Sequence, residues 1–159
     1  MLVYLINTLK QTIRNDMNIK SLLFRQLEKH EIPLANQFYK RVYKKGVANK
    51  SEQVFVLKDK QIYCAARLKE GEDYLLLTGV ACDPHVRRQG LASLLIRQLL
   101  QKQYKYPIYC FPYPDLQHFY LQLGFTQCAI EELPDTLASR YQRYNQRTPL
   151  LCMVKRKIN

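Results

Sequence analysis

One stretch near the middle of the chain constrains the fold more than any other. Residues 75–82 form an apolar run of strand length, which Asp83 and Pro84 end. A short basic loop follows, and from Leu91 onward apolar residues recur at the spacing of one helix face. Strand, tight loop and helix in this order predict a right-handed crossover to a parallel strand at residues 107–111.

The loop between this strand and this helix, residues 87–92, has the composition of an anion-binding site. Gly90 leaves backbone N–H groups unobstructed, and the start of a helix carries a partial positive charge. Arg87 and Arg88 add two full charges, so a pyrophosphate fits the loop well. The alternative is that the glycine and the arginines serve only capping and solubility.

The rest of the chain alternates strand and helix patterns without repeats or flexible linkers. Helices are expected at residues 32–45, 90–103 and 115–123, with Asp115 as the N-cap of the last, and residues 135–146 have the pattern of a helix or an ordered loop. This order predicts an α/β fold with a mixed, mostly antiparallel sheet, one parallel strand–helix–strand unit and helices on both faces. Strands are expected at residues 21–27, 53–57, 62–68, 74–82, 107–111, 125–130 and 150–156.

The composition bounds the class of protein. At 159 residues the chain is long enough for one domain with a substantial core. The net charge of +12 is uneven, because residues 51–133 are neutral overall and the excess lies in the two ends. This excess suits an anionic cofactor and acidic acceptors, or a nucleic-acid surface. Nucleic acid is the less favoured partner, since the sequence has no RGG, zinc-knuckle or helix-turn-helix pattern.

Five cysteines lie far apart in the sequence, at positions 64, 82, 110, 128 and 152. They form no C-x-x-C motif and no Cys/His pair at zinc spacing, so we expect free, buried thiols in a reducing compartment and no metal site. No apolar segment has transmembrane length, and the first residues lack the basic region and cleavage site of a signal peptide. These features predict a cytoplasmic protein without a membrane partner.

Two motifs resemble the signatures of the GNAT superfamily of N-acetyltransferases. Residues 87–92 have the order R-x-x-G-x-A after a strand that ends in Asp-Pro, which resembles the coenzyme A loop of that family. Some thirty residues later, residues 118–125 place an aromatic pair before Leu-Gly-Phe, which resembles the family's second signature. The resemblance covers about residues 21–157, and the two motifs occur in the family's order and separation.

The resemblance implies a GNAT-like acyl-CoA N-acyltransferase fold with acetyl-CoA as cosubstrate. The sheet would open between the strands at 74–82 and 107–111 and hold the pantetheine arm. Tyr120 matches the position of a general acid that protonates the departing thiolate, and the alternative is an aromatic side chain that only packs beneath the sheet. The pantetheine would pair with the backbone of Val80, Ala81 and Cys82, and the pyrophosphate would lie on Arg87, Arg88, Gln89, Gly90, Leu91 and Ala92.

The base that deprotonates the acceptor amine is unassigned. Many members of the family have an asparagine shortly after the fifth strand, whereas residues 110–115 contain none, and that strand lacks the glutamate that some members use as a base. A water relay is one possibility. The candidate side chains are Glu31, Glu72, Asp73, Asp115 and His118.

A basic helix face marks the segment that the family places beside the acceptor. Arg140, Arg143, Tyr144 and Arg147 recur at helical spacing. Such a face can hold a carboxylate, a phosphate or an RNA backbone. The favoured alternative is a solvated amphipathic helix with one tyrosine half buried.

The function implied by the resemblance is an acetyl-CoA-dependent N-acetyltransferase acting on a primary amine. The acceptor can be a small molecule, a peptide or a protein. The sequence also leaves open whether the chain forms a homodimer. The alternative is a non-catalytic acyl-CoA-binding sensor or scaffold of the same fold, which the missing asparagine and the unassigned base both allow.

Residues 17–159 are expected to form the single N-acetyltransferase domain, and residues 1–16 a short helical extension. Because a helix of that length is marginal alone, a chain that begins at Met17 should unfold cooperatively and still be stabilised by acetyl-CoA. Thermal unfolding with and without acetyl-CoA measures this. Aggregation of the shortened chain would show instead that the extension covers core or a partner.

Overall fold

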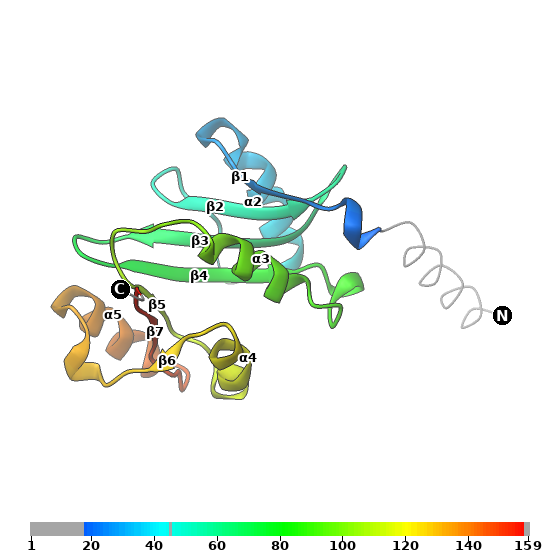
Figure 1. Ribbon diagram of the computed structural model, residues 1–159. Coiled ribbons are helices and arrows are strands. Elements are labelled where there is room, and N and C mark those ends of the chain that lie inside the picture. The colour runs from blue at the N-terminus through cyan, green and yellow to red at the C-terminus, as the bar shows by residue number, and fades with distance from the viewer. Residues whose placement is uncertain (1–17, 45, 158–159) are drawn as a thin grey trace.

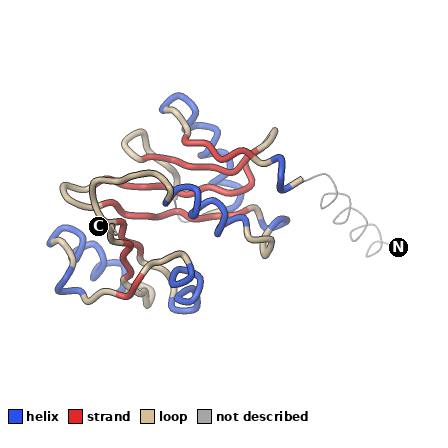
Figure 2. Tube along the Cα trace, in the orientation of Figure 1, coloured by secondary structure: helices blue, strands red, loops and turns tan. Residues whose placement is uncertain are grey.

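Seven strands form one sheet in the computed structural model, which describes residues 18–44 and 46–157 (Figures 1 and 2). The spatial order is β1-β2-β3-β4-β5-β7-β6, and every neighbouring pair is antiparallel except β4 and β5. The predicted fold class is therefore confirmed, while the extension at residues 1–16 lies outside the described residues. The strands are β1 Leu23–Gln26, β2 Gln53–Lys58, β3 Ile62–Glu70, β4 Leu75–Cys82, β5 Ile108–Cys110, β6 Thr126–Gln127 and β7 Met153–Lys155.

Helices cover both faces of the sheet, as the sequence predicts. On β2, Phe55 packs into the cluster that contains α3 and α4, whereas its neighbour Val54 packs into the cluster that contains α2. On β4, Leu76 packs with α5 on the same face as α2, because it points opposite to Leu75 and Leu77. The helices are α2 Ile32–Val42, α3 Leu91–Leu100, α4 Gln117–Gln122 and α5 Asp135–Asn145.

Three element predictions are corrected at their ends. The helix expected at 32–45 ends at Val42, because Tyr43 has an extended backbone with φ −141°. The strand expected at 125–130 pairs only at Thr126–Gln127, and a 3-10 turn occupies Ile130–Glu132. Asp115 is not an N-cap, since it lies inside a 3-10 turn that precedes α4. Short polar segments at element ends carry too little periodicity to fix these boundaries.

The crossover from β4 through α3 to β5 positions the site. The two strands pair in parallel over only three residues, from Leu75 with Ile108 to Leu77 with Cys110. β4 then continues to Cys82, still paired with β3, while β5 ends at Cys110. The edge of β4 beyond Leu77 is therefore left open toward β5, which confirms the opening that the family resemblance implies.

A bulge in β4 lies at the start of this opening. Thr78 pairs with Arg67 but Ala81 pairs with Ala65, so β4 has one residue more than β3 in this interval. Gly79, with φ +61°, takes up the extra residue in the left-handed region. Because the bulge shifts the side-chain alternation, Val80 packs on the same face as Leu77 rather than on the opposite one.

The cysteine prediction is wrong for one pair. Cys64 and Cys82 are directly opposite each other on β3 and β4 and form a disulfide. Their separation of 18 residues hides this proximity, which only the strand register creates. Cys110, Cys128 and Cys152 are buried free thiols, as predicted.

Within residues 18–44 and 46–157, no helix is long and apolar enough to cross a membrane. The same residues contain no cluster of three or more His, Cys, Asp or Glu side chains suited to a metal ion.

The two left-handed glycines of the β4–α3 region should respond differently to alanine. A Cβ at Gly79 would overlap the Arg67 side chain, whereas a Cβ at Gly90 would meet nothing within 4 Å. Gly90→Ala should lower the free energy of unfolding by about 1–2 kcal/mol from backbone strain alone. Gly79→Ala should add roughly 1–3 kcal/mol of steric cost to a similar strain. Urea denaturation of both variants measures this, and equal losses would contradict the close contact at the bulge.

Candidate functional site

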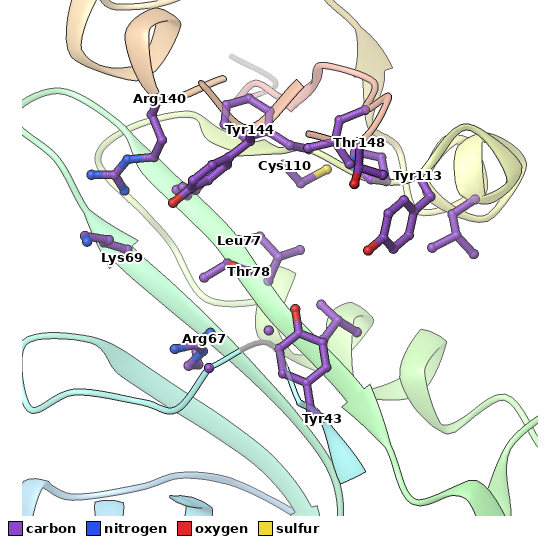
Figure 3. A pocket seen from close by; sticks show the side chains of 18 of the residues that line it. Tyr43, Arg67, Lys69, Leu77, Thr78, Cys110, Tyr113, Arg140, Tyr144 and Thr148 are labelled. Carbon is purple, nitrogen blue, oxygen red and sulfur yellow. The ribbon is translucent and has the colours of Figure 1, made fainter. Parts of the chain in front are cut away.

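A pocket of about 770 Å³ lies where β4 and β5 separate (Figure 3). Its walls come from β3, β4 and β5, from α4 and α5, and from the segments that follow α2 and α5. The pocket therefore connects the α3/α4 face of the sheet to the α2/α5 face. The polar and charged side chains that line the pocket, together with Val80 on the open edge of β4, include Tyr43, Glu52, Arg67, Lys69, Tyr113, Tyr120, Arg140, Tyr144 and Arg147.

The predicted site residues fall into two places. Val80 and Tyr120 line the pocket, which brings the predicted acid beside the open edge of β4. Ala81 and Cys82 continue that edge away from the pocket. The predicted loop at residues 87–92 does not line the pocket, and it follows the end of β4 at the start of α3.

The loop before α3 has the features of an anion site. Gly90 is the N-cap of α3 with φ +79°, and it supplies no side chain to cap the helix. The first helical bond to its carbonyl comes from Leu94 at 2.9 Å, so the N–H groups before Leu94 have no partner within the helix. Arg87 and Arg88 are exposed beside them, and Arg87 Nε donates to the Cys82 carbonyl at 3.3 Å. A phosphate can thus approach both backbone donors and full charges.

A buried carboxylate fixes the start of this loop. Asp83 accepts from Arg41 Nη1 at 2.5 Å and from the His85 N–H at 3.0 Å. Burial alone would raise the pKa of the Asp83 carboxyl, but these two hydrogen bonds and the Arg41 charge outweigh it and hold the pKa below its usual value. The ionised carboxylate therefore ties the end of β4 to α2.

Tyr120 is held rigidly with its ring buried. The ring packs edge-on against Phe119 and Phe125, with centroids 5.0 Å and 5.5 Å away. Burial raises the pKa of the Tyr120 hydroxyl, and the nearby Cys110 and Tyr43 raise it further. The phenol therefore stays protonated at neutral and moderately alkaline pH, so it can donate a proton and cannot serve as a base.

The pocket contains a buried ion pair that the sequence analysis missed. Arg67 Nη1 donates to the Val47 carbonyl at 2.6 Å and to Glu52 Oε2 at 3.2 Å. Its guanidinium also lies 5.2 Å from the centroid of the Tyr39 ring. Arg67 Nε is buried without a hydrogen-bond partner. A signal was present in the sequence, since Arg67 is a charged residue inside an otherwise apolar strand.

The candidate bases do not lie in the pocket. None of the five carboxylate and imidazole candidates from the sequence is among the described lining residues. Glu52 is the carboxylate that does line it, yet this side chain also accepts the Asn49 N–H at 3.0 Å in addition to its bond with Arg67. Both of these hydrogen bonds are to Oε2, so Glu52 ties the loop before β2 to Arg67 on β3.

The basic face near the C-terminus is only partly a solvated surface. Arg140, Tyr144 and Arg147 line the pocket, and Arg147 lies beyond the end of α5. Arg143 is exposed outside it and lies 6.0 Å from the centroid of the Tyr144 ring. Arg143, Tyr144 and Arg147 are exposed, as the favoured interpretation of a solvated face predicts, whereas Arg140 is half-buried in the pocket wall.

Comparison with known proteins agrees with this geometry. A profile of the acetyltransferase (GNAT) domain matches residues 50–127. No curated protein sequence matches the chain. Among solved structures, N-acetylglutamate synthase from Neisseria gonorrhoeae, complexed with coenzyme A and N-acetyl-glutamate, superposes with a TM-score of 0.67 at 19% identity. The match covers 87% of this chain but only 35% of the synthase, so the chain spans about a third of that protein's length.

Two further solved structures have lengths closer to this chain. An acyl-CoA N-acyltransferase from Pseudomonas aeruginosa gives a TM-score of 0.63 at 18% identity, over 86% of this chain and all 100% of that one. The ribosomal-protein-S18-alanine N-acetyltransferase from Escherichia coli gives 0.57 at 18% identity, over 84% of this chain and 90% of that one. At these sequence identities the solved structures support only the fold. The evidence for the family is the match to the domain profile, together with the two sequence motifs. The chain therefore contains an acetyltransferase domain of the GNAT family, matched over residues 50–127.

Proposed function

We propose that the chain is an acetyl-CoA-dependent N-acetyltransferase that acetylates a primary amine. The observation that carries this proposal is the open edge of β4, which leads from the anion loop at α3 to a pocket containing Tyr120. The crystal structure of the Neisseria synthase, which shares the fold, contains coenzyme A.

The chain offers a separate group for each part of the cosubstrate. The N–H groups at the start of α3, with Arg87 and Arg88, would hold the pyrophosphate. The backbone of Val80, Ala81 and Cys82 has no strand partner on the β5 side and would pair with the pantetheine amides. The acetyl thioester would then enter the pocket at Val80 and Tyr120.

The reaction needs one nucleophilic attack and two proton movements. The neutral amine nitrogen attacks the thioester carbonyl carbon, a free β4 N–H polarises the carbonyl oxygen, and the carbon–sulfur bond breaks. Tyr120 donates its phenolic proton to the departing sulfur, and the new amide loses its extra proton to water. Water returns a proton to Tyr120, so the products are free coenzyme A and the acetylated amine. Apart from the two substrates, every step uses only side chains, backbone groups and water.

One observation favours the second candidate, a non-catalytic acyl-CoA-binding sensor. None of the five predicted base candidates lines the described pocket, and the carboxylate that does, Glu52, is hydrogen-bonded to Arg67. A sensor would bind acetyl-CoA without releasing thiol in the presence of amines. Thiol release over a panel of amines therefore separates the two candidates.

Gly90→Asp should weaken acetyl-CoA binding at least tenfold, or about 1.4 kcal/mol. The added carboxylate would lie in the open space beside the helix N–H groups and repel the phosphates. Isothermal titration calorimetry measures the affinity. Gln101→Asp is the matched control, since it adds the same charge at the exposed other end of α3 and should leave the affinity unchanged. Unchanged affinity in folded Gly90→Asp would contradict the cofactor assignment.

Tyr120→Phe should lower kcat by about 10- to 1,000-fold and change acetyl-CoA affinity only a few-fold. The substitution removes the donated proton and keeps the buried ring. Steady-state kinetics should be measured beside Tyr43→Phe, because the Tyr43 hydroxyl also points into the pocket (Figure 3). A larger kcat loss in Tyr43→Phe than in Tyr120→Phe would assign the acid to Tyr43 instead.

A further inference from the structure

The pocket is strongly asymmetric in charge. Figure 3 shows the side chains of Arg67, Lys69 and Arg140 grouped on one side of the cavity. The hydroxyls of Tyr43 and Tyr113 point into the cavity from elsewhere on its wall. The cationic side belongs to β3 and α5, whereas the cofactor loop follows the far end of β4. The charge therefore lies on the side from which the acceptor, not coenzyme A, would enter.

The cationic side chains have spare binding capacity. Lys69 and Arg140 are half-buried, and within the described residues neither has an ion-pair partner. Arg67 Nη1 donates to both Glu52 and the Val47 carbonyl, and these two bonds fix the guanidinium in the pocket wall. Its side chain is 9% exposed, and Nε is buried without a partner. A buried cation held in place but only partly satisfied is suited to bind an anion.

The net charge of the lining is positive even with the buried carboxylate included. Arg67, Lys69, Arg140 and Arg147 are opposed by Glu52 alone among the described lining residues. Glu52 is 5% exposed in its side chain and lies against Arg67, so it compensates one cation only. A ligand that enters this side therefore meets an uncompensated positive potential.

We infer that the acceptor is a small primary amine that also carries an anionic group, a carboxylate or a phosphate, held by Arg67, Lys69 and Arg140. The inference rests on the proposed N-acetyltransferase function and names the substrate class of the same site. Guanidinium groups bind both kinds of anion through paired N–H donors. A polybasic peptide or a polyamine is excluded as acceptor, because it would add positive charge to this recess.

The same charges also favour the neutral, reactive form of the acceptor amine. A primary amine is mostly protonated at neutral pH and must lose that proton before it attacks. Neighbouring cations disfavour the ammonium form and so release the proton to water. The anionic group of the acceptor supplies the binding energy that brings the amine into these surroundings.

A series of amines with one carbon skeleton tests the inference. L-Glutamate, L-glutamine and L-glutaminamide carry two, one and no carboxylates and the same α-amine. O-Phosphoethanolamine and ethanolamine form a second, matched pair for the phosphate source, and a lysine-rich peptide serves as the polybasic probe. Thiol release from acetyl-CoA gives kcat/KM for each. Because an amide lowers the basicity of the neighbouring amine, a preference for glutamate cannot arise from a larger fraction of neutral amine.

The expected result is a kcat/KM at least tenfold higher for the anionic member of one pair than for its uncharged member. A higher kcat/KM for L-glutamate within the amino-acid series would identify the anionic group of the acceptor as a carboxylate. A higher kcat/KM for O-phosphoethanolamine than for ethanolamine would identify it as a phosphate. Equal values, or faster acetylation of the uncharged or polybasic probes, would overturn the inference and leave the N-acetyltransferase function standing.

Two variants test whether Arg140 and Lys69 cause the preference for an anionic amine. Arg140→Gln and Lys69→Gln should each raise KM for the preferred anionic amine at least tenfold, more at low salt than at high salt, with KM for acetyl-CoA unchanged. Arg143→Gln is the matched control, since it removes an exposed arginine of the same helix outside the pocket. If KM for the anionic amine were unchanged in both pocket variants, Arg140 and Lys69 would not form an anion site.

Binding separates this inference from the function on which it rests. If no amine releases thiol, the proposed function fails. Calorimetric titration of the coenzyme A-loaded protein with L-glutamate, L-glutaminamide and the two ethanolamines then decides the inference alone. Tighter binding of an anionic member, lost in Arg140→Gln but kept in Arg143→Gln, supports the anion site, and no difference overturns it.

Discussion

The contact between the Arg67 side chain and the bulge at Gly79 determines the shape of the site. A Cβ at this position would overlap the guanidinium, and glycine adopts φ +61° without strain. The Tyr39 hydroxyl donates to the Gly79 carbonyl at 2.7 Å and so fixes the bulge from α2. Because the bulge re-aims β4 just where β5 ends, these contacts position both the open strand edge and the pocket beside it.

Burying a charged residue at this point is costly, and the structure offsets that cost only in part. Glu52, the Val47 carbonyl and the Tyr39 ring all lie against the guanidinium of Arg67. An ion pair of this kind is seldom more stable than a well-packed apolar pair of equal volume. Its retention is easier to explain by the pocket, where a fixed cation can meet a ligand, than by the stability of the sheet.

The parts of the structure that the sequence predicts are those encoded locally. The crossover unit with Gly90 directly before its helix follows from periodicity and one motif, and a second motif places Tyr120 on a short helix. The Cys64–Cys82 bond and the Arg67–Glu52 pair depend on which residues the strand register or a loop brings together. Neither the sequence spacing nor the residue type reveals such proximity, so the acceptor side of the pocket was the least predictable part.

The uneven charge of the chain gains a physical meaning from this arrangement. The neutral middle segment carries the proposed cofactor motifs, in which backbone N–H groups would do most of the anion binding and few full charges are needed. The basic C-terminal segment contributes Arg140 and Arg147 to a wall that β3 completes with Arg67 and Lys69. In the proposed function, two kinds of anion recognition would thus lie at opposite ends of one opening. The directional backbone donors suit a fixed pyrophosphate, whereas long cationic side chains adapt to an acceptor and lower the proton affinity of its amine.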